Sequence, residues 1–234
     1  MRGVEMEELV ALARAADRVL MPGHLLLYHP AVRKLKELVE TGELGDVLCV
    51  YANRQNLGVI RSSENALWSL GVHDLSVILW LLGEEPESAV AHGRDFLQPG
   101  VEDVVFCYLR FPSGRIAHLH LSWLDPHKMR KLTVVGRDRM AVFDDMELER
   151  KVTIYDKAPW EPSGTYGEWR TRTGDIFSPK VPSDEPLRLE MQHFVELVRA
   201  GPGDHREALE GFAVVRALDA LTASLRGEAG GQTP

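Results

Sequence analysis

RSSENALWSLGVHDLSVILWLLG, residues 61–83, decides the fold because its polar first half is followed by an almost wholly apolar second half. The apolar run over residues 75–82 predicts a helix that is buried along its length. Ser69 and His73 are four residues apart and would share a helical face, whereas Asp74 would point about a quarter-turn away. This pattern indicates a ligand site at the front of a buried helix. The alternative is that His73 is only a hydrogen-bonded packing residue.

The composition predicts a soluble globular protein, because 44% of the 234 residues are hydrophobic and the net charge is −8. Apolar runs stay well short of the roughly 18 residues that a membrane span requires. The acidic N-terminus, MRGVEMEELV, is unlike a signal peptide, so we expect a cytoplasmic location. The negative charge argues against nucleic acid as a partner, because phosphate binding needs clustered Lys and Arg. Cys49 and Cys107 lie in apolar contexts and are expected to be reduced core thiols.

The first residues have the pattern of half an α/β repeat. Residues 4–16 carry apolar side chains at helical spacing, and residues 18–24, RVLMPGH, predict a short strand that ends in a loop with His24. No strand is predicted before this pair. The chain also has no G-x-G-x-x-G turn that opens a helix after a strand, which a dinucleotide-binding repeat would carry.

The next two elements have clear signals. Residues 30–42 predict a helix that begins at Pro30 and stops at Gly42. Residues 45–58, GDVLCVYANRQNLG, predict an interior strand because both of its faces are apolar. The end of this strand would place Arg54 beside the helix predicted over residues 61–83.

Residues 87–156 predict short strands joined by tight turns, which is typical of an antiparallel meander. Residues 157–183 are rich in Pro, Gly and Thr and predict an irregular excursion. Helices are predicted over residues 186–200 and 205–226. The result is an α+β fold in which helices cover one face of a large, mostly antiparallel sheet. The open face of this sheet predicts a homo-oligomer, either a dimer or a tetramer.

Two other combinations of residues carry weaker signals. His118 and His120 would lie on one face of a strand, with His127 nearby, as in some zinc sites. No Cys or Glu ligand is close in sequence, so polar histidines on a sheet face are favoured and no metal site is predicted. Ser69 and His73 have the residue types of a nucleophile and its base. Hydrolysis is nevertheless disfavoured, because the G-x-S-x-G turn is absent.

Three segments resemble the C-terminal domain of the Gfo/Idh/MocA family of nicotinamide-dependent sugar oxidoreductases. They are GHLLLYHPAVRKLKELVETGELGDV from residue 23, WSLGVHDLSVILWLLGEEP from residue 68, and SWLDPHKMRKLTVVGRDRMAVFDD from residue 122. The resemblance extends from about residue 4 to about residue 226. The family motif D-x-G-x-H is matched at Gly71 and His73, with Ser69 in the first position. Within the family, the chain is similar to the branch of UDP-N-acetylglucosamine and uronate 3-dehydrogenases.

The resemblance implies roles for individual residues. His73 would be the catalytic residue, a proton relay at the sugar carbon that loses hydride. His24, together with Tyr28, would approach the nicotinamide or the sugar. Lys128 and Arg130 could meet a diphosphate, although a solvated basic turn is an equal alternative. The residues that would bind the substrate, a sugar or nucleotide-sugar, are Tyr28, Arg54, Asn65, Ser69 and Lys128.

The resemblance also implies a domain division. Residues 1–24 would be a remnant helix and strand of a Rossmann dinucleotide-binding domain, residues 25–226 the substrate and oligomerisation domain, and residues 227–234 a disordered tail. The family uses NAD or NADP, but the glycine-rich turn and the E-K-P lysine are absent, so no cofactor is expected on this chain alone. A truncated, inactive oxidoreductase is therefore the first expectation. The alternatives are a non-catalytic protein that binds sugar nucleotides or oligomerises, and a subunit complemented by another chain.

Overall fold

The computed structural model describes residues 3–162, 169–201 and 203–228. The N-terminal elements are helix α1 (Gly3–Ala15), the 3-10 turn η1 (Leu25–Tyr28), α2 (Pro30–Glu40), β1 (Val47–Gln55), the π-helical turn η2 (Leu67–Gly71) and α3 (Val72–Leu82). Strands β2 (Ser88–Arg94), β3 (Val104–Arg110), β4 (Ile116–Ser122), β5 (Met129–Gly136), β6 (Met140–Asp144), β7 (Val152–Pro162) and β8 (Trp169–Phe177) follow. Helices α4 (Pro186–Ala200) and α5 (Arg206–Leu225) complete the order.

The strands form one sheet in the order β2-β3-β4-β1-β5-β6-β7-β8. β1 runs parallel to β4 and antiparallel to β5, so it is the interior strand that its two apolar faces predicted. The predicted meander is therefore divided into two antiparallel parts by a strand from earlier in the chain. The insertion brings the end of β1 into the middle of the sheet, where it can reach the helical layer.

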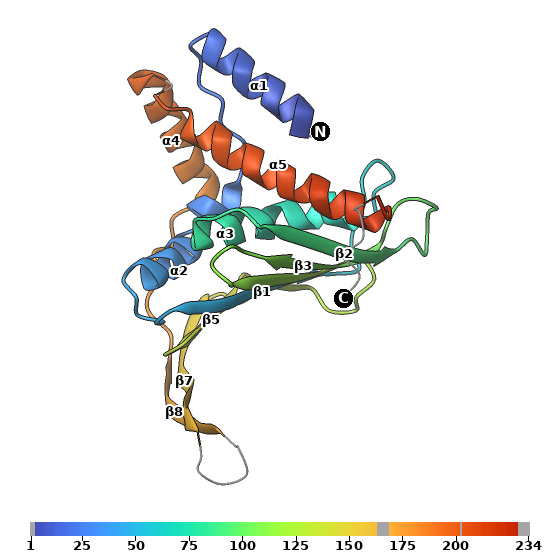
Figure 1. Ribbon diagram of the computed structural model, residues 1–234. Coiled ribbons are helices and arrows are strands. Elements are labelled where there is room, and N and C mark those ends of the chain that lie inside the picture. Colours follow the sequence, from blue (N-terminus) through green and yellow to red (C-terminus); the bar gives the residue numbers. More distant parts are fainter. Residues whose placement is uncertain (1–2, 163–168, 202, 229–234) are drawn as a thin grey trace.

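The helices cover one face of the sheet, as Figure 1 shows. α3 lies directly on the strands and is buried along most of its length, as the apolar run predicted. α5 contacts both α3 and β2, and α1 packs on α5 through Met6 and Val10. The α+β class with a mostly antiparallel sheet is confirmed. None of the helices in the described ranges combines the length and apolar character that a bilayer span needs.

Two predicted segments differ in the structure. Residues 18–24 follow α1 but form no strand, because no described strand lies beside them to complete a hydrogen-bonded ladder. The irregular excursion predicted over residues 157–183 is mostly the β7–β8 hairpin, which extends away from the helical layer (Figure 1). Pro159 lies at a register shift, where a strand can accept proline. Of the predicted tail, residues 229–234 lie outside the described part of the chain.

A close backbone contact fixes how the chain enters β1. A Cβ atom on Gly136, at the end of β5, would lie 2.8 Å from the carbonyl carbon of Leu44 and closer still to its oxygen. That oxygen also accepts hydrogen bonds from the backbone N–H groups of Asp138 and Arg139. The turn before β1 can therefore approach β5 only because residue 136 has no side chain.

We expect Gly136→Ala to destabilise the protein by about 1–3 kcal/mol, because the added methyl group meets backbone that cannot rotate away. Gly23→Ala is the matched control, since its Cβ would lie 3.9 Å from the Glu190 Oε1 atom, an ordinary contact. Urea denaturation measures both changes. Equal stabilities of the two variants would show that the turn can shift to accept a side chain.

Candidate functional site

A cavity of about 560 Å³ lies where the end of β1 meets the start of α3. It brings together three of the predicted site residues, Arg54, Ser69 and His73. We call it the His73 cavity. Its other walls come from η1, the loops after β4 and β6, and the segment before α4, and the further lining residues used below are His29, Arg130 and Asp145.

Arg54 is held by a buried ion pair with Asp74. The Arg54 Nε and Nη2 atoms donate to the two carboxylate oxygens of Asp74 at 2.7 and 2.9 Å. The side chains of both residues are almost fully buried. This bidentate geometry joins the end of β1 to the first turn of α3. Asp74 therefore acts through Arg54, on a different side of the helix from His73.

The turn that carries Ser69 is pressed against the sheet. η2 has π-helical hydrogen bonding, a form that is rare and is often found at functional sites. Gly71 is buried, and a Cβ atom there would lie 2.8 Å from the Leu121 Cδ1 atom of β4. The glycine of the G-x-H sequence thus permits close packing between η2 and β4, and it sets the height of Ser69 and His73 above the strands.

The electrostatic environment of His73 favours the neutral imidazole. Burial, followed by the positive charges of Arg54 and Arg130, lowers the pKa of His73, and the negative charge of Asp74 opposes this change. A neutral ring has one nitrogen that can accept a proton. His73 is therefore able to act as a base near neutral pH, in a cavity that also offers a hydroxyl and a guanidinium group.

His29 and Asp145 also line the cavity and were not predicted as site residues. The His29 Nδ1 atom accepts a hydrogen bond from the Ala31 N–H at 3.0 Å and so caps α2. Its Nε2 atom lies 3.9 Å from Asp145, which also pairs with Arg130 at 3.3 Å and Lys151 at 3.7 Å. A His before Pro at a helix start is a possible sequence signal for the cap. No sequence signal predicts Asp145, because only the tertiary fold brings the loop after β6 close to His29.

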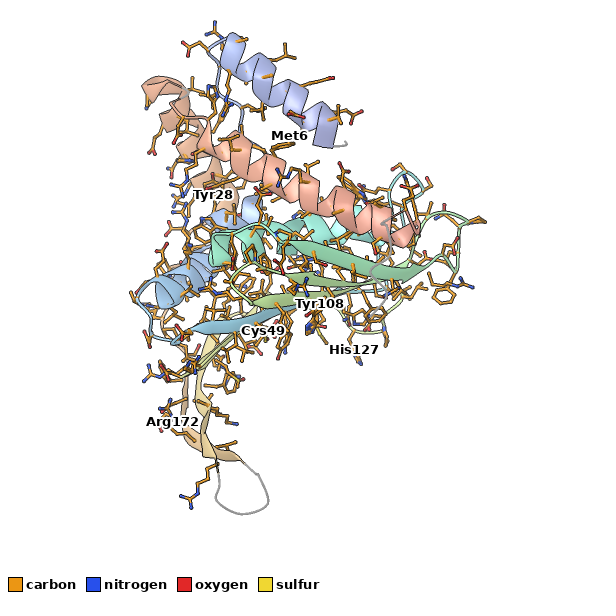
Figure 2. The ribbon with its side chains drawn as sticks, viewed as in Figure 1. Met6, Tyr28, Cys49, Tyr108, His127 and Arg172 are labelled. Carbon is orange, nitrogen blue, oxygen red and sulfur yellow. The ribbon has the colours of Figure 1, made fainter. Side chains whose placement is uncertain are left out.

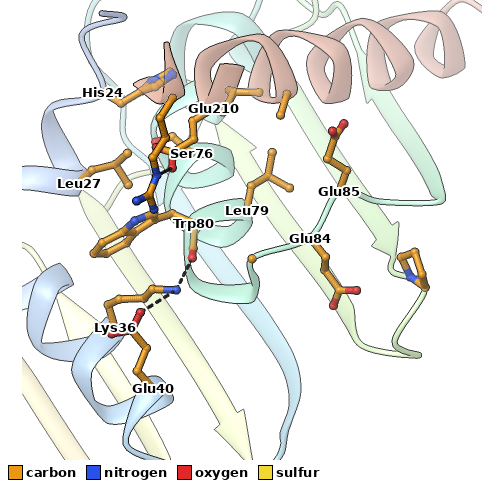
Figure 3. Close-up of a pocket in the computed structure, with 15 residues that line it drawn as sticks. His24, Leu27, Lys36, Glu40, Ser76, Leu79, Trp80, Glu84, Glu85 and Glu210 are labelled. Atoms are coloured by element: carbon orange, nitrogen blue, oxygen red, sulfur yellow. Dashed lines mark hydrogen bonds and ion pairs between the residues drawn. The ribbon is translucent and has the colours of Figure 1, made fainter. Parts of the chain in front are cut away.

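Four predicted site residues lie elsewhere. Asn65 caps the turn before α3, because its Oδ1 atom accepts from the Trp68 N–H at 3.1 Å, and it lines a separate cavity. Tyr28 is buried, and its hydroxyl donates to the Met21 sulfur at 3.6 Å. Lys128 is exposed in the loop before β5. His24 lines another cavity, shown in Figure 3.

The histidines of β4 are on the open face of the sheet. His118 stacks on Tyr51 with ring centroids 4.9 Å apart, and His120 stacks on Phe106 at 4.3 Å. His127 is exposed in the following loop. Within the described parts of the chain, no three His, Cys, Asp or Glu side chains are grouped so that they could hold a metal ion. His118 and His120 therefore stack on aromatic neighbours on the sheet face.

Residues 32–142 match the family model described as the GFO/IDH/MocA C-terminal domain. This part of the chain, slightly less than half of its length, is thus similar to a Gfo/Idh/MocA C-terminal domain. A solved protein from Magnetospirillum magnetotacticum is 29% identical, with a TM-score of 0.76 over 94% of this chain and 68% of its own. UDP-N-acetylglucosamine 3-dehydrogenase from Acidithiobacillus ferrooxidans is 22% identical and has the same fold, with a TM-score of 0.76 over 97% of this chain and 69% of its own.

Among curated relatives, scyllo-inositol 2-dehydrogenase (NAD(+)) from Bacillus subtilis is 26% identical over 76% of this chain. That match spans 52% of the Bacillus protein, so the chain covers about half the length of this relative. The similar proteins thus include a polyol dehydrogenase and a nucleotide-sugar dehydrogenase. The similarity supports the oxidoreductase family and does not single out the nucleotide-sugar branch.

We expect Arg54→Met to destabilise the protein by about 3–5 kcal/mol, because it leaves the Asp74 carboxylate buried without its partner. The double variant Arg54→Met/Asp74→Leu should recover most of this loss, since both charges are then removed. Thermal and urea denaturation of the two variants measure the effect. A loss below about 1 kcal/mol for Arg54→Met would mean that water replaces the guanidinium group.

Proposed function

We propose that the chain provides the substrate site of an NAD(P)-dependent oxidoreductase acting on a sugar, a polyol or a nucleotide-linked sugar. The observation that carries this proposal is the His73 cavity, where a neutral imidazole, the Ser69 hydroxyl and the fixed Arg54 guanidinium lie together. Polyhydroxylated substrates offer many hydrogen-bond donors and acceptors, and these three groups complement them. Arg130, which lines the same cavity, could meet a phosphate group of a nucleotide-linked sugar.

His73 has the role of general base in this proposal. It accepts the proton of a substrate hydroxyl, and oxidation of the carbon that bears this hydroxyl would require the nicotinamide cofactor that the family uses. Arg54 and Ser69 hold the substrate so that one hydroxyl faces the imidazole. General-base catalysis of this kind typically contributes about 10²–10⁴-fold, provided that the geometry is held. The buried pair with Asp74 provides that rigidity for Arg54.

The described residues do not fit the dinucleotide itself. Pyrophosphate is usually bound by a glycine-rich turn between a strand and a helix N-terminus. α1 opens the described part of the chain, and the helices α2, α3, α4 and α5 follow η1, η2 or loops, none of which is such a turn. We therefore propose that this chain alone binds neither NAD nor NADP usefully. The same observation favours the second candidate, a non-catalytic protein that binds a sugar nucleotide in the His73 cavity.

We expect His73→Asn to fold nearly as well as the wild type but to bind its ligand about five- to tenfold more weakly, since one hydrogen bond contributes roughly 1 kcal/mol. Titration calorimetry with scyllo-inositol and UDP-N-acetylglucosamine measures binding, and thermal melts measure folding. His127→Asn in the exposed loop is the control. A variant of His73 that loses stability and keeps its affinity would establish a packing role instead.

The open face of the sheet supports the proposal of a homo-oligomer. Strand alternation leaves Phe106 and Tyr108 exposed, at 53% and 44%, and Val90 and Ile176 extend the same face over β2 and β8. Figure 2 shows Tyr108 on the side of the sheet away from the helices. Exposed aromatic and apolar side chains on one face of a sheet often mark an interface. We propose that a second copy of the chain covers it.

The wild-type chain should sediment as a dimer or larger species at micromolar concentration, and Phe106→Glu should shift it toward the monomer, because a charge would be buried in the interface. Phe96→Glu is the matched control, since Phe96 is also exposed, at 66%, but lies in a loop after β2. Sedimentation velocity separates these cases. A monomeric wild type would contradict the proposed interface.

A further inference from the structure

The helix cap at His29 fixes which ring nitrogen of this residue carries the proton. The Nδ1 atom accepts the hydrogen bond from the Ala31 N–H at 3.0 Å that caps α2. A ring nitrogen that accepts a hydrogen bond carries no proton, so the proton of the neutral ring lies on Nε2. Burial lowers the pKa of His29, and the charge of Asp145 opposes this change. His29 is therefore a hydrogen-bond donor through Nε2.

Both His29 and Asp145 are held in place by contacts within the chain. The His29 imidazole packs on the Phe143 ring of β6, with the ring centroids 5.1 Å apart. The Asp145 N–H donates to the Arg130 carbonyl oxygen at 2.9 Å. Only 11% of the His29 side chain and 19% of the Asp145 side chain are exposed. Because both residues also line the His73 cavity, they present a rigid donor and a rigid acceptor to a ligand.

The distance between this donor and this acceptor is too long for a direct hydrogen bond. The His29 Nε2 atom lies 3.9 Å from the Asp145 Oδ1 atom, whereas N–H···O bonds span about 2.7–3.2 Å. One oxygen atom at about 2.8 Å from each of them fits this spacing, at the third corner of a triangle. A hydroxyl at that corner would accept from the imidazole N–H and donate to the carboxylate.

Asp145 has acceptor capacity left for such a hydroxyl. Arg130 pairs with its Oδ2 atom at 3.3 Å, and Lys151 makes only a longer contact with Oδ1, at 3.7 Å. An ionised carboxylate offers about four lone-pair sites. The Oδ1 atom that faces His29 can therefore accept a hydrogen bond from a ligand while both ion pairs persist.

We propose that His29 and Asp145 form a subsite for one hydroxyl group of a sugar or polyol bound in the His73 cavity. The inference rests on the proposed function. The hydroxyl accepts from the His29 Nε2–H and donates to the Asp145 carboxylate. A carbonyl or ether oxygen can only accept, so it would leave the carboxylate without its donor. A site built to bond a hydroxyl rejects analogues that lack it, and these two residues therefore determine specificity.

Water is the competing occupant of this subsite, because it also donates and accepts hydrogen bonds. The two occupants differ in how variants of His29 and Asp145 change ligand affinity. If a ligand hydroxyl lies there, removal of either partner weakens binding. If water remains there when the ligand is bound, both variants bind the ligand as the wild type does.

The donor is tested first without a ligand, by the ¹⁵N chemical shifts of the His29 ring near pH 7. The cap requires the tautomer with the proton on Nε2. A proton on Nδ1 would overturn the subsite, because His29 could then not donate through Nε2.

His29→Asn separates the ligand contact from the helix cap, because asparagine is also a good N-cap residue but lacks the Nε2 donor. We expect it to melt close to the wild type and to bind scyllo-inositol and UDP-N-acetylglucosamine about five- to tenfold more weakly by calorimetry. A loss of stability without a loss of affinity would restrict His29 to the cap and overturn its role in the subsite.

Asp145→Ala should weaken binding about ten- to a hundredfold, since hydrogen bonds to charged groups are stronger than those between neutral groups. Asp144→Ala is the matched control. Asp144 also forms an ion pair, with Lys131 at 3.0 Å, but it does not line the His73 cavity. The control should bind both compounds like the wild type.

The double variant His29→Asn/Asp145→Ala tests whether both residues hold the same hydroxyl. Its affinity loss should be clearly smaller than the product of the two single losses, because either change already releases this hydroxyl. Losses that multiply would mean that the two residues contact different groups, which would overturn the subsite. Affinities within about twofold of the wild type in both single variants would overturn it as well and leave water as the occupant.

Failure of the proposed function gives a different result. If neither compound binds the wild-type chain, the proposed function fails, and the subsite that rests on it fails too. If the wild type binds and His73→Asn weakens binding but the variants of His29 and Asp145 do not, only the hydroxyl subsite is overturned.

Discussion

The buried ion pair between Arg54 and Asp74 is the interaction on which the candidate site depends. It joins β1, in the middle of the sheet, to the first turn of the helix that lies on it. A buried ion pair adds little net stability compared with apolar side chains, but an arrangement that separates the two charges is strongly disfavoured. The pair therefore specifies geometry, and it fixes Arg54 relative to Ser69 and His73.

Most of the fold could be predicted because its signals are local. The apolar run of α3, the proline that begins α2 and the alternation within the strands each depend on residues close in sequence. The pairing of Cys49 with Ile116 has no local signal, so the insertion of β1 beside β4 could not be predicted from the sequence pattern. The β7–β8 hairpin was missed because Pro159 and Gly174 suggested a loop, although both lie within paired strands.

Three of the predicted site residues line one cavity, and their signals in the sequence are also local. Ser69 and His73 could be recognised from helical spacing, and Arg54 from its place at a strand end. Asn65 lies outside the His73 cavity because its side chain is used to cap the turn before α3, as a polar residue at a helix start often is. Asp145 reaches the cavity only through tertiary packing after β6, which no spacing in the sequence records.

The apolar second half of α3 allows the first turn of the same helix to be polar. The second half of α3 is packed between the sheet and α5, so its position is fixed by buried side chains alone. Its first turn is then free to present Asp74 to β1 and His73 to a cavity without either group having to stabilise the helix. Burial lowers the pKa of His73 and of His24, so both rings stay neutral near pH 7 and keep a nitrogen that can accept a proton. The rigid half of the helix is thus what makes proton chemistry possible at the other half.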